Sequence, residues 1–131
     1  MSLAPIRKKV LVIDDNPGIL FAMQEALRLK DYDVHISEMF AGVEKIEKSA
    51  PDLIYLDISL VGQDGREVTK ELKGDGRTKN IPIIILTAYP NANELTKEAG
   101  ADDYLSKPFE LENLWKMTAK YTSGAKKKSV R

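Results

Sequence analysis

Two kinds of hydrophobic pattern alternate along this chain. Short apolar runs are typical of buried strands, and longer stretches with apolar residues at every third or fourth position are typical of one helix face. The run IPIIIL at 81–86 indicates a central strand covered on both sides, and Asn16 with Pro17 marks the first turn of a helix. The patterns predict strands over 9–14, 33–37, 52–58, 81–86 and 103–106, and helices over 16–30, 38–49, 66–73, 90–99 and 109–121.

The predicted order of elements is a strand followed by a helix, five times in succession. Such an alternation with short connections favours a parallel sheet with helices on both faces and right-handed crossovers. We therefore predict an α/β doubly wound (βα)5 domain over 9–122, an unstructured segment over 1–8 and a basic flexible tail over 123–131. Residues 63–65 are expected to form a turn, and Gly100 is expected to end the fourth helix.

Polar residues stand at the points where the predicted strands end. Sites in open parallel sheets lie just beyond the carboxyl ends of the strands, so these residues are the first candidates for function. The second strand ends with Ser37 and Glu38, which suggest no particular chemistry. The other ends carry Asp14 and Asp15, then Asp57, then Thr87 and Ala88, and last Ser106, Lys107 and Pro108.

Asp57 is the hardest of these residues to explain by structure alone. It follows the apolar run LIYL at 53–56, where an unpaired carboxylate is expensive to bury. Two carboxylates about 4 Å apart repel by about 4 kcal/mol at an effective dielectric constant of about 20, so a converging trio with Asp14 and Asp15 needs a cation or must take up protons. Hard oxygen ligands select Mg²⁺, Ca²⁺ or Mn²⁺ rather than zinc, and a site with few protein ligands and room for a phosphate suits Mg²⁺ best. Lys107 and Thr87 add donors for an oxyanion, which completes the parts for forming an aspartyl phosphate.

The composition is that of an ordinary globular domain, with 43% hydrophobic and 31% charged residues. A formal net charge of zero gives no electrostatic reason to bind nucleic acid or an anionic membrane. The chain has no cysteine, which excludes a disulfide framework and a thiolate metal site. It also lacks an apolar run of membrane-spanning length and a signal-peptide core, so a cytoplasmic location is expected.

Four motifs in this order resemble those of response-regulator receiver domains of two-component signalling. They are VLVIDD at 10–15, LIYLDISL at 53–60 with DG at 64–65, PIIILTA at 82–88 and GADDYLSKPF at 100–109. The resemblance implies a flavodoxin-like fold with strand order 2-1-3-4-5, similar to that of a chemotaxis regulator. It also implies a phosphorelay switch, with a sensor histidine kinase or phosphotransfer protein as donor, an effector or output domain as target, and no direct binding of nucleic acid or membrane by this domain.

The resemblance further implies a role for each matching residue around a bound Mg²⁺ ion. Asp57 would be the phosphoacceptor and a metal ligand. Asp15 would bind Mg²⁺ directly and Asp14 mainly through water, with the Ser59 backbone carbonyl as a third protein ligand.

A second group of residues is implied to act on the phosphoryl group and in the switch. Thr87 would contact the phosphoryl group and Lys107 would pair with it, while Tyr104 would turn inward when Thr87 moves. The Lys107–Pro108 peptide bond would be cis, a form that only bonds preceding proline reach at low cost.

This sequence departs from the family pattern around the same site. Leu60-Val61 stands where the family usually has Met-Pro, and Tyr89 is bulkier than the small residue that is common two positions after Thr87. With Ser59, Tyr89 is expected to set the lifetime of the phosphoryl group, and we predict slow dephosphorylation. The stretch between Thr87 and Lys107 is slightly short for the family, which predicts a short fourth helix and an altered output face.

Two other functions fit parts of the pattern. A Mg²⁺-dependent phosphatase with an aspartate nucleophile usually has a second acid two residues on, where this chain has Ser59. A pseudo-receiver that binds partners without being phosphorylated would not need the complete set of acids, threonine and lysine.

Overall fold

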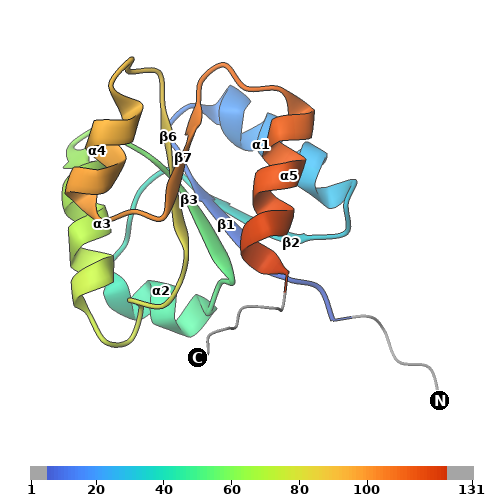
Figure 1. Ribbon diagram of the computed structural model, residues 1–131. Coiled ribbons are helices and arrows are strands. Elements are labelled where there is room, and N and C mark those ends of the chain that lie inside the picture. The colour runs from blue at the N-terminus through green and yellow to red at the C-terminus, as the bar shows by residue number, and fades with distance from the viewer. Residues whose placement is uncertain (1–5, 124–131) are drawn as a thin grey trace.

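The structure is a computed structural model that describes residues 6–123, so most of the predicted tail and the start of the N-terminal segment lie outside the described residues. One sheet of five parallel strands forms the centre of the molecule, in the order β2-β1-β3-β6-β7 (Figure 1). This is the predicted doubly wound fold with the strand order that the resemblance implied. The strands are β1 (Lys9–Ile13), β2 (Asp33–Ser37), β3 (Leu53–Asp57), β6 (Ile83–Thr87) and β7 (Asp103–Ser106).

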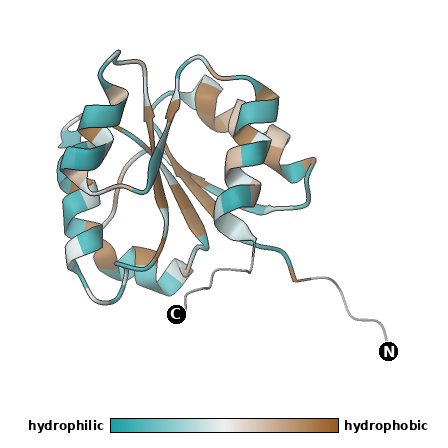
Figure 2. Cartoon of the chain, viewed as in Figure 1, coloured by the Kyte–Doolittle hydropathy of each residue, from teal (hydrophilic) through white to brown (hydrophobic). Residues whose placement is uncertain are grey.

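Five helices cover the two faces of the sheet (Figure 1). One face carries α1 (Pro17–Arg28) and α5 (Leu111–Thr122), and the other carries α2 (Val43–Ser49), α3 (Gly65–Gly74) and α4 (Ala92–Ala99). Apolar residues lie along the strands, whereas the outer surfaces of the helices are largely polar (Figure 2). Within residues 6–123, no helix is both long and apolar enough to cross a membrane.

The sheet separates two hydrophobic cores, because successive side chains of a strand point to opposite faces. In β1, Val10 and Val12 join the core under α1 and α5, whereas Leu11 and Ile13 join the core under α2, α3 and α4. We call these the α1–α5 core and the α2–α4 core. Burying one such side chain contributes about 1.5–3 kcal/mol, so the two cores hold the strand ends, and the polar residues that follow them, in place.

Several local predictions are confirmed at the helix ends. Asn16 caps α1, and its Oδ1 accepts a hydrogen bond from the Ile19 N–H at 3.1 Å. Gly100 follows α4 in the left-handed conformation, with φ of 83°, as expected of a residue that ends a helix. The α4 helix is short, with 8 residues, and begins at Ala92 rather than at the predicted residue 90.

Two local predictions are wrong. The helix expected over 38–49 begins only at Val43, because Gly42 has φ of 105°, outside helical geometry, and Phe40 lies buried in the preceding loop. The turn expected at 63–65 belongs to a β-hairpin, in which β4 (Ser59–Leu60) pairs antiparallel with β5 (Gln63–Asp64). Its strands are too short to give an alternating pattern in the sequence.

Candidate functional site

The three candidate carboxylates lie together at the carboxyl ends of neighbouring strands. Asp14 and Asp15 follow β1, Asp57 ends β3, and the two strands pair side by side. One carboxylate oxygen from each residue lies within 4.8 Å of the others. Asp14 and Asp57 are buried and Asp15 is partly exposed, so the cluster opens to solvent on the Asp15 side.

Lys107 supplies the positive charge of this cluster. Its Nζ lies 2.8 Å from Asp14 Oδ2 and 3.5 Å from Asp57 Oδ1. The residue follows β7, its backbone N–H donates to the Thr87 carbonyl at 2.8 Å, and the Lys107–Pro108 peptide bond is cis. One lysine leaves three carboxylates with a net negative charge, so the site favours a further cation.

Asp14 has an oxygen that the protein leaves without a hydrogen bond. Its Oδ1 accepts from the Asn16 N–H at 2.9 Å. Its Oδ2 is the one buried side-chain oxygen among residues 6–123 that accepts no hydrogen bond, because its contact with Lys107 is an ion pair outside hydrogen-bond geometry. The Lys107 ammonium, 2.8 Å away, offsets part of the free-energy cost of burying this oxygen, and a bound cation would offset it further. The all-oxygen donor set therefore fits a hard divalent ion such as Mg²⁺.

The environment of Asp57 disfavours its charge. Burial raises the pKa of Asp57 most strongly, and the nearby charges of Asp14 and Asp15 raise the pKa further. The Ser59 N–H, which donates to Asp57 Oδ1 at 3.1 Å, and the Lys107 ammonium act in the opposite direction. A bound cation would compensate the same repulsion and keep the carboxylate ionised.

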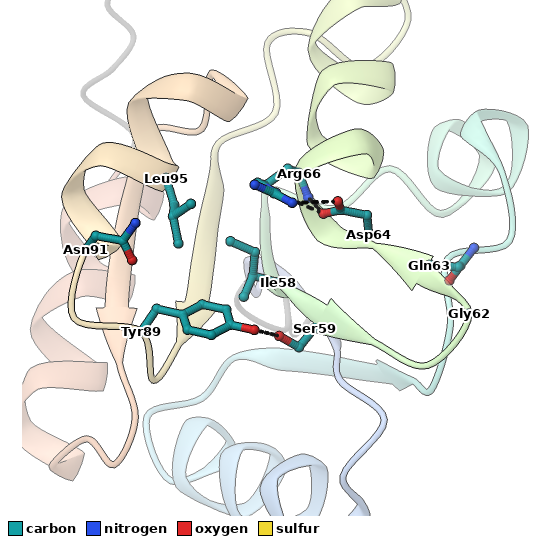
Figure 3. Close-up of a pocket in the computed structure, with 9 residues that line it drawn as sticks. All are labelled: Ile58, Ser59, Gly62, Gln63, Asp64, Arg66, Tyr89, Asn91 and Leu95. Carbon is teal, nitrogen blue, oxygen red and sulfur yellow. Dashed lines mark hydrogen bonds and ion pairs between the residues drawn. The ribbon is translucent and has the colours of Figure 1, made fainter.

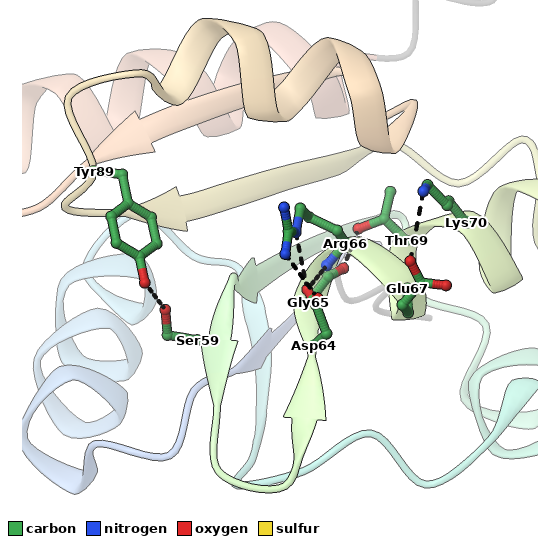
Figure 4. Close-up of polar contacts among 8 residues, drawn as sticks. All are labelled: Ser59, Asp64, Gly65, Arg66, Glu67, Thr69, Lys70 and Tyr89. Atoms are coloured by element: carbon green, nitrogen blue, oxygen red, sulfur yellow. Dashed lines mark hydrogen bonds and ion pairs between the residues drawn. The ribbon is translucent and has the colours of Figure 1, made fainter.

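The loops after β3 and β6 are joined beside the cluster. The Tyr89 N–H donates to Thr87 Oγ1 at 3.0 Å, and Ser59 Oγ donates to Tyr89 Oη at 3.3 Å (Figure 4). The Thr87 side chain is buried, whereas the Tyr89 side chain is half-exposed. Tyr104 is partly buried on β7 against the α2–α4 core.

Beside this link lies a cavity of about 510 Å³ between the β4–β5 hairpin and α4. The Tyr89 ring and the Ile58 and Leu95 side chains line it, with Asn91 beside Leu95 and Arg66 on the opposite side next to Asp64 (Figure 3). Sequence reasoning did not find this cavity, because its walls come from separate segments. The other lining residues are Ser59, Gly62, Gln63 and Asp64.

Sequence reasoning also missed a contact at the tip of the hairpin. The Val61 N–H donates to Asp15 Oδ2 at 2.9 Å. The only available signal was that Val61 stands where the family usually has proline, since proline has no N–H to donate.

Fold and site together define a class of protein. A doubly wound sheet carries, at the carboxyl ends of β1, β3 and β7, three aspartates and a lysine arranged for a divalent cation and an oxyanion. The chain belongs to the response regulator receiver domain family, whose match covers residues 10–119. It is therefore a receiver domain of two-component signalling.

Similar proteins of known name or structure agree with this family. The response regulator MprA of Mycobacterium tuberculosis is 37% identical over 111 residues, which are 81% of this chain and 46% of MprA. The chemotaxis protein CheY4 of Vibrio cholerae has a TM-score of 0.80 at 28% identity, covering 88% of this chain and 99% of CheY4. A third similar protein is the receiver domain of the sensor histidine kinase PA1611 of Pseudomonas aeruginosa, solved with a magnesium ion in its active-site cleft. It has a TM-score of 0.75 at 28% identity, and the match covers 90% of this chain and 99% of the PA1611 domain.

Proposed function

We propose that this receiver domain is a phosphorylation switch in which Asp57 accepts the phosphoryl group. The observation that carries the proposal is the convergence of Asp14, Asp15 and Asp57 within 4.8 Å, beside the Lys107 ammonium group. Buried charges of this kind are weak contributors to stability, so a functional reason is the better explanation for the group. The arrangement suits a reaction that brings a divalent cation and a phosphoryl group to one place.

In the proposed reaction an oxygen of the Asp57 carboxylate attacks phosphorus and forms a new P–O bond. The bond from phosphorus to the donor nitrogen or oxygen breaks, and its electron pair leaves with the donor. Such transfers depend mainly on positioning and charge neutralisation. Lys107 Nζ, 3.5 Å from Asp57 Oδ1, is placed to pair with the phosphoryl oxygens. Later hydrolysis of the acyl phosphate returns the switch to its resting form.

Asp14, Asp15, Asp57 and the Ser59 carbonyl are the groups that would hold Mg²⁺, which when bound neutralises charge on the acids and the phosphoryl oxygens. The pairing of Leu60 with Gln63 closes the hairpin, so the preceding residue, Ser59, points its N–H and C=O out of the ladder. Its N–H accordingly reaches Asp57, which leaves the carbonyl for a metal. The magnesium ion in the similar PA1611 receiver domain also supports this assignment.

The switch would run from Asp57 through Thr87 to Tyr104. Thr87 Oγ1 accepts a hydrogen bond from Tyr89, and within residues 6–123 no acceptor takes its hydrogen. We assign that hydrogen to a phosphoryl oxygen on Asp57. A bond to a charged group contributes about 1.5–3 kcal/mol, whereas a shift of an equilibrium from about 1:99 to about 99:1 needs about 5.5 kcal/mol. One or two such bonds would therefore shift only part of the population to the second conformation of the face formed by α4, β7 and α5, on which Tyr104 lies.

The proposed phosphodonors are a sensor histidine kinase, a phosphotransfer protein or a small acyl phosphate, and the proposed target is an effector or output domain. The chain spans about half the length of MprA, 46%, which leaves room in that relative for a further domain. The cytoplasmic location and the domain limits of 9–122 stay predictions from the sequence.

Acyl-phosphate formation tests the proposal directly. The protein is incubated with Mg²⁺ and acetyl phosphate, and its intact mass is measured. We expect a mass increase of one phosphoryl group that is absent with EDTA and absent in Asp57→Ala. No label on the wild type would favour a pseudo-receiver, and label that persists in Asp57→Ala would place the phosphoryl group elsewhere. Sustained release of phosphate from phosphomonoesters would favour a phosphatase.

A further inference from the structure

The tip of the β4–β5 hairpin reaches across to a proposed metal ligand that lies far away in the sequence. The Val61 N–H donates to Asp15 Oδ2 at 2.9 Å, and the two residues are 46 positions apart. Among residues 6–123, no other donor contacts the Asp15 carboxylate through a hydrogen bond or ion pair, so its other oxygen remains available to a cation.

The hairpin that carries this N–H is held at three points besides its tip. The Gln63 side chain both accepts from the Phe40 N–H and donates to the Phe40 carbonyl, each at 3.0 Å. At the base, the Gly65 N–H donates to the Ile58 carbonyl at 3.0 Å, and Ser59 N–H donates to Asp57. The tip is therefore presented by a fixed frame rather than by a free loop.

The Val61 side chain does not explain why the tip lies where it does. That side chain is 84% exposed and packs into neither core, so the backbone N–H is the part of Val61 that the site uses. Val61 and Gly62 are the two central residues of the hairpin turn, and Gly62 has φ of 75°. A positive φ at the second central residue is the signature of a type II turn, in which proline fits at the first.

We propose that the Val61 N–H is a positioning group for Mg²⁺ binding, a role that rests on the proposed function of the site. By holding one oxygen of Asp15, it turns the other toward Asp14 and Asp57 before the ion arrives. Groups that orient a metal ligand in this way contribute about 10- to 100-fold to metal affinity. The hairpin, which also carries Ser59, thereby couples the metal site to the cavity beside it.

Val61→Pro tests the proposal, because proline fits this turn, follows the extended residue Leu60 and lacks only the N–H. Mg²⁺ affinity is measured by isothermal titration calorimetry without phosphodonor, and circular dichroism verifies the fold. We expect about tenfold weaker Mg²⁺ binding in Val61→Pro and wild-type binding in Val61→Ala, which keeps the N–H. Equal or tighter binding by a folded Val61→Pro would overturn the proposal.

A second pair of variants decides the question if Val61→Pro does not fold. In Gly62→Val the turn is strained, because a branched side chain is disfavoured at φ of 75°, and the Val61 N–H should be displaced. In Gly62→Asn the turn should be kept, because asparagine tolerates that conformation. We expect weaker Mg²⁺ binding by Gly62→Val than by Gly62→Asn, and equal binding would overturn the proposal. If the wild-type protein binds no Mg²⁺, the proposed metal site itself is contradicted. If the wild type binds Mg²⁺ and the substitutions at positions 61 and 62 leave its affinity unchanged, only the role of the hairpin is contradicted.

Discussion

Asp57 is the residue at which the demands of stability and of the proposed function oppose each other. Burial, with the charges of Asp14 and Asp15, raises the pKa of Asp57 in the folded protein above its ordinary value of about 3.9. Ionisation of Asp57 therefore costs folding free energy. The cost is absent below the unfolded pKa, grows as the pH rises between the unfolded and folded pKa values, and is complete above the folded pKa.

Replacing Asp57 with Asn should raise the free energy of unfolding at about pH 7 in metal-free buffer, because the variant carries no charge to bury. The difference in the free energy of unfolding between variant and wild type should shrink as the pH falls toward about 4, where Asp57 is protonated in the wild type. Added Mg²⁺ should also reduce this difference, because it binds and stabilises the wild type. Urea unfolding with EDTA measures both effects. Asp31→Asn, at an exposed acid whose φ of 65° asparagine tolerates, is the control and should change little. An Asp57→Asn protein less stable than the wild type at pH 7 would contradict this account.

Tyr89 is the second residue whose side chain has a consequence for the proposed chemistry. Tyr89 is 52% exposed at the edge of the site. The Ser59 hydroxyl donates to the Tyr89 hydroxyl, and the Tyr89 backbone N–H donates to the Thr87 side chain. We predict that the ring, next to Ser59, shields a phosphoryl group on Asp57 from attacking water.

Tyr89→Ala should therefore shorten the half-life of phosphorylated Asp57 severalfold, because water gains access to the acyl phosphate. Tyr89→Phe keeps the ring and loses only the contact with Ser59, so its half-life should stay close to that of the wild type. Intact mass followed over time after removal of the phosphodonor gives the decay rates. A half-life in Tyr89→Ala as long as in the wild type would show that the ring does not protect the phosphoryl group.

At the scale of elements, the junction between the hairpin and α3 is closely packed at Gly65. A Cβ atom on Gly65 would lie 2.5 Å from the Asp57 carbonyl oxygen and 2.6 Å from the Ile58 Cα. Asp64 caps the helix that begins there, accepting from the Arg66 N–H at 2.9 Å, and its pairing with the Arg66 guanidinium lowers the pKa of Asp64 (Figure 4). The first turn of α3 thus lies directly against the backbone of Asp57 and Ile58.

Gly65→Ala should lower the free energy of unfolding by about 1–3 kcal/mol, because backbone atoms rather than flexible side chains must move to accept the methyl group. Gly74→Ala, at the other end of the same helix, is the matched control, since among the described residues no atom beyond its chain neighbours and the nearby helix backbone lies within 4 Å of its Cβ position. It should be neutral or stabilising by up to about 1 kcal/mol. Urea unfolding of both variants measures the difference, and equal stability would show that the close approach at Gly65 relaxes at no cost.

At the scale of the whole molecule, one sheet supplies a wall to both hydrophobic cores. The strands β1, β3 and β6 are buried on both faces, so neither core can open without exposing residues of the other. On one side, Trp115 Nε1 of α5 donates to the Ala26 carbonyl of α1 at 2.8 Å, which makes Trp115 a reporter of the α1–α5 core. We therefore expect the domain to unfold as one cooperative unit.

Leu72→Ala tests this expectation from the opposite side of the sheet. Leu72 lies fully buried on α3 in the α2–α4 core, and its truncation should cost about 2–5 kcal/mol. In a cooperative domain, the urea midpoint from Trp115 fluorescence should fall as far as the midpoint from far-UV circular dichroism. A Trp115 midpoint that stays at its wild-type value would show that the two cores unfold separately.

Much of the fold and of the candidate site was predictable from the sequence, because both depend on local order along the chain. The alternation of apolar runs with helical spacing defines five strands and five helices, and parallel strands place their carboxyl ends on one edge. Asp14, Asp57, Thr87 and Lys107 could therefore be identified as neighbours from their positions at strand ends alone. Errors occurred where a local signal was weak, as at Gly42 before α2 and in the two-residue strands of the hairpin.

Only the tertiary structure decided which atoms meet at the site. The pairing of Lys107 with Asp14, the contact of the Val61 N–H with Asp15 and the cavity beside Tyr89 each join segments far apart in the chain. Hydrophobic periodicity specifies which face of an element is buried, but it carries no information on the path of a loop or the direction of a backbone N–H. Those depend on how the packed sheet and helices hold the loops between them.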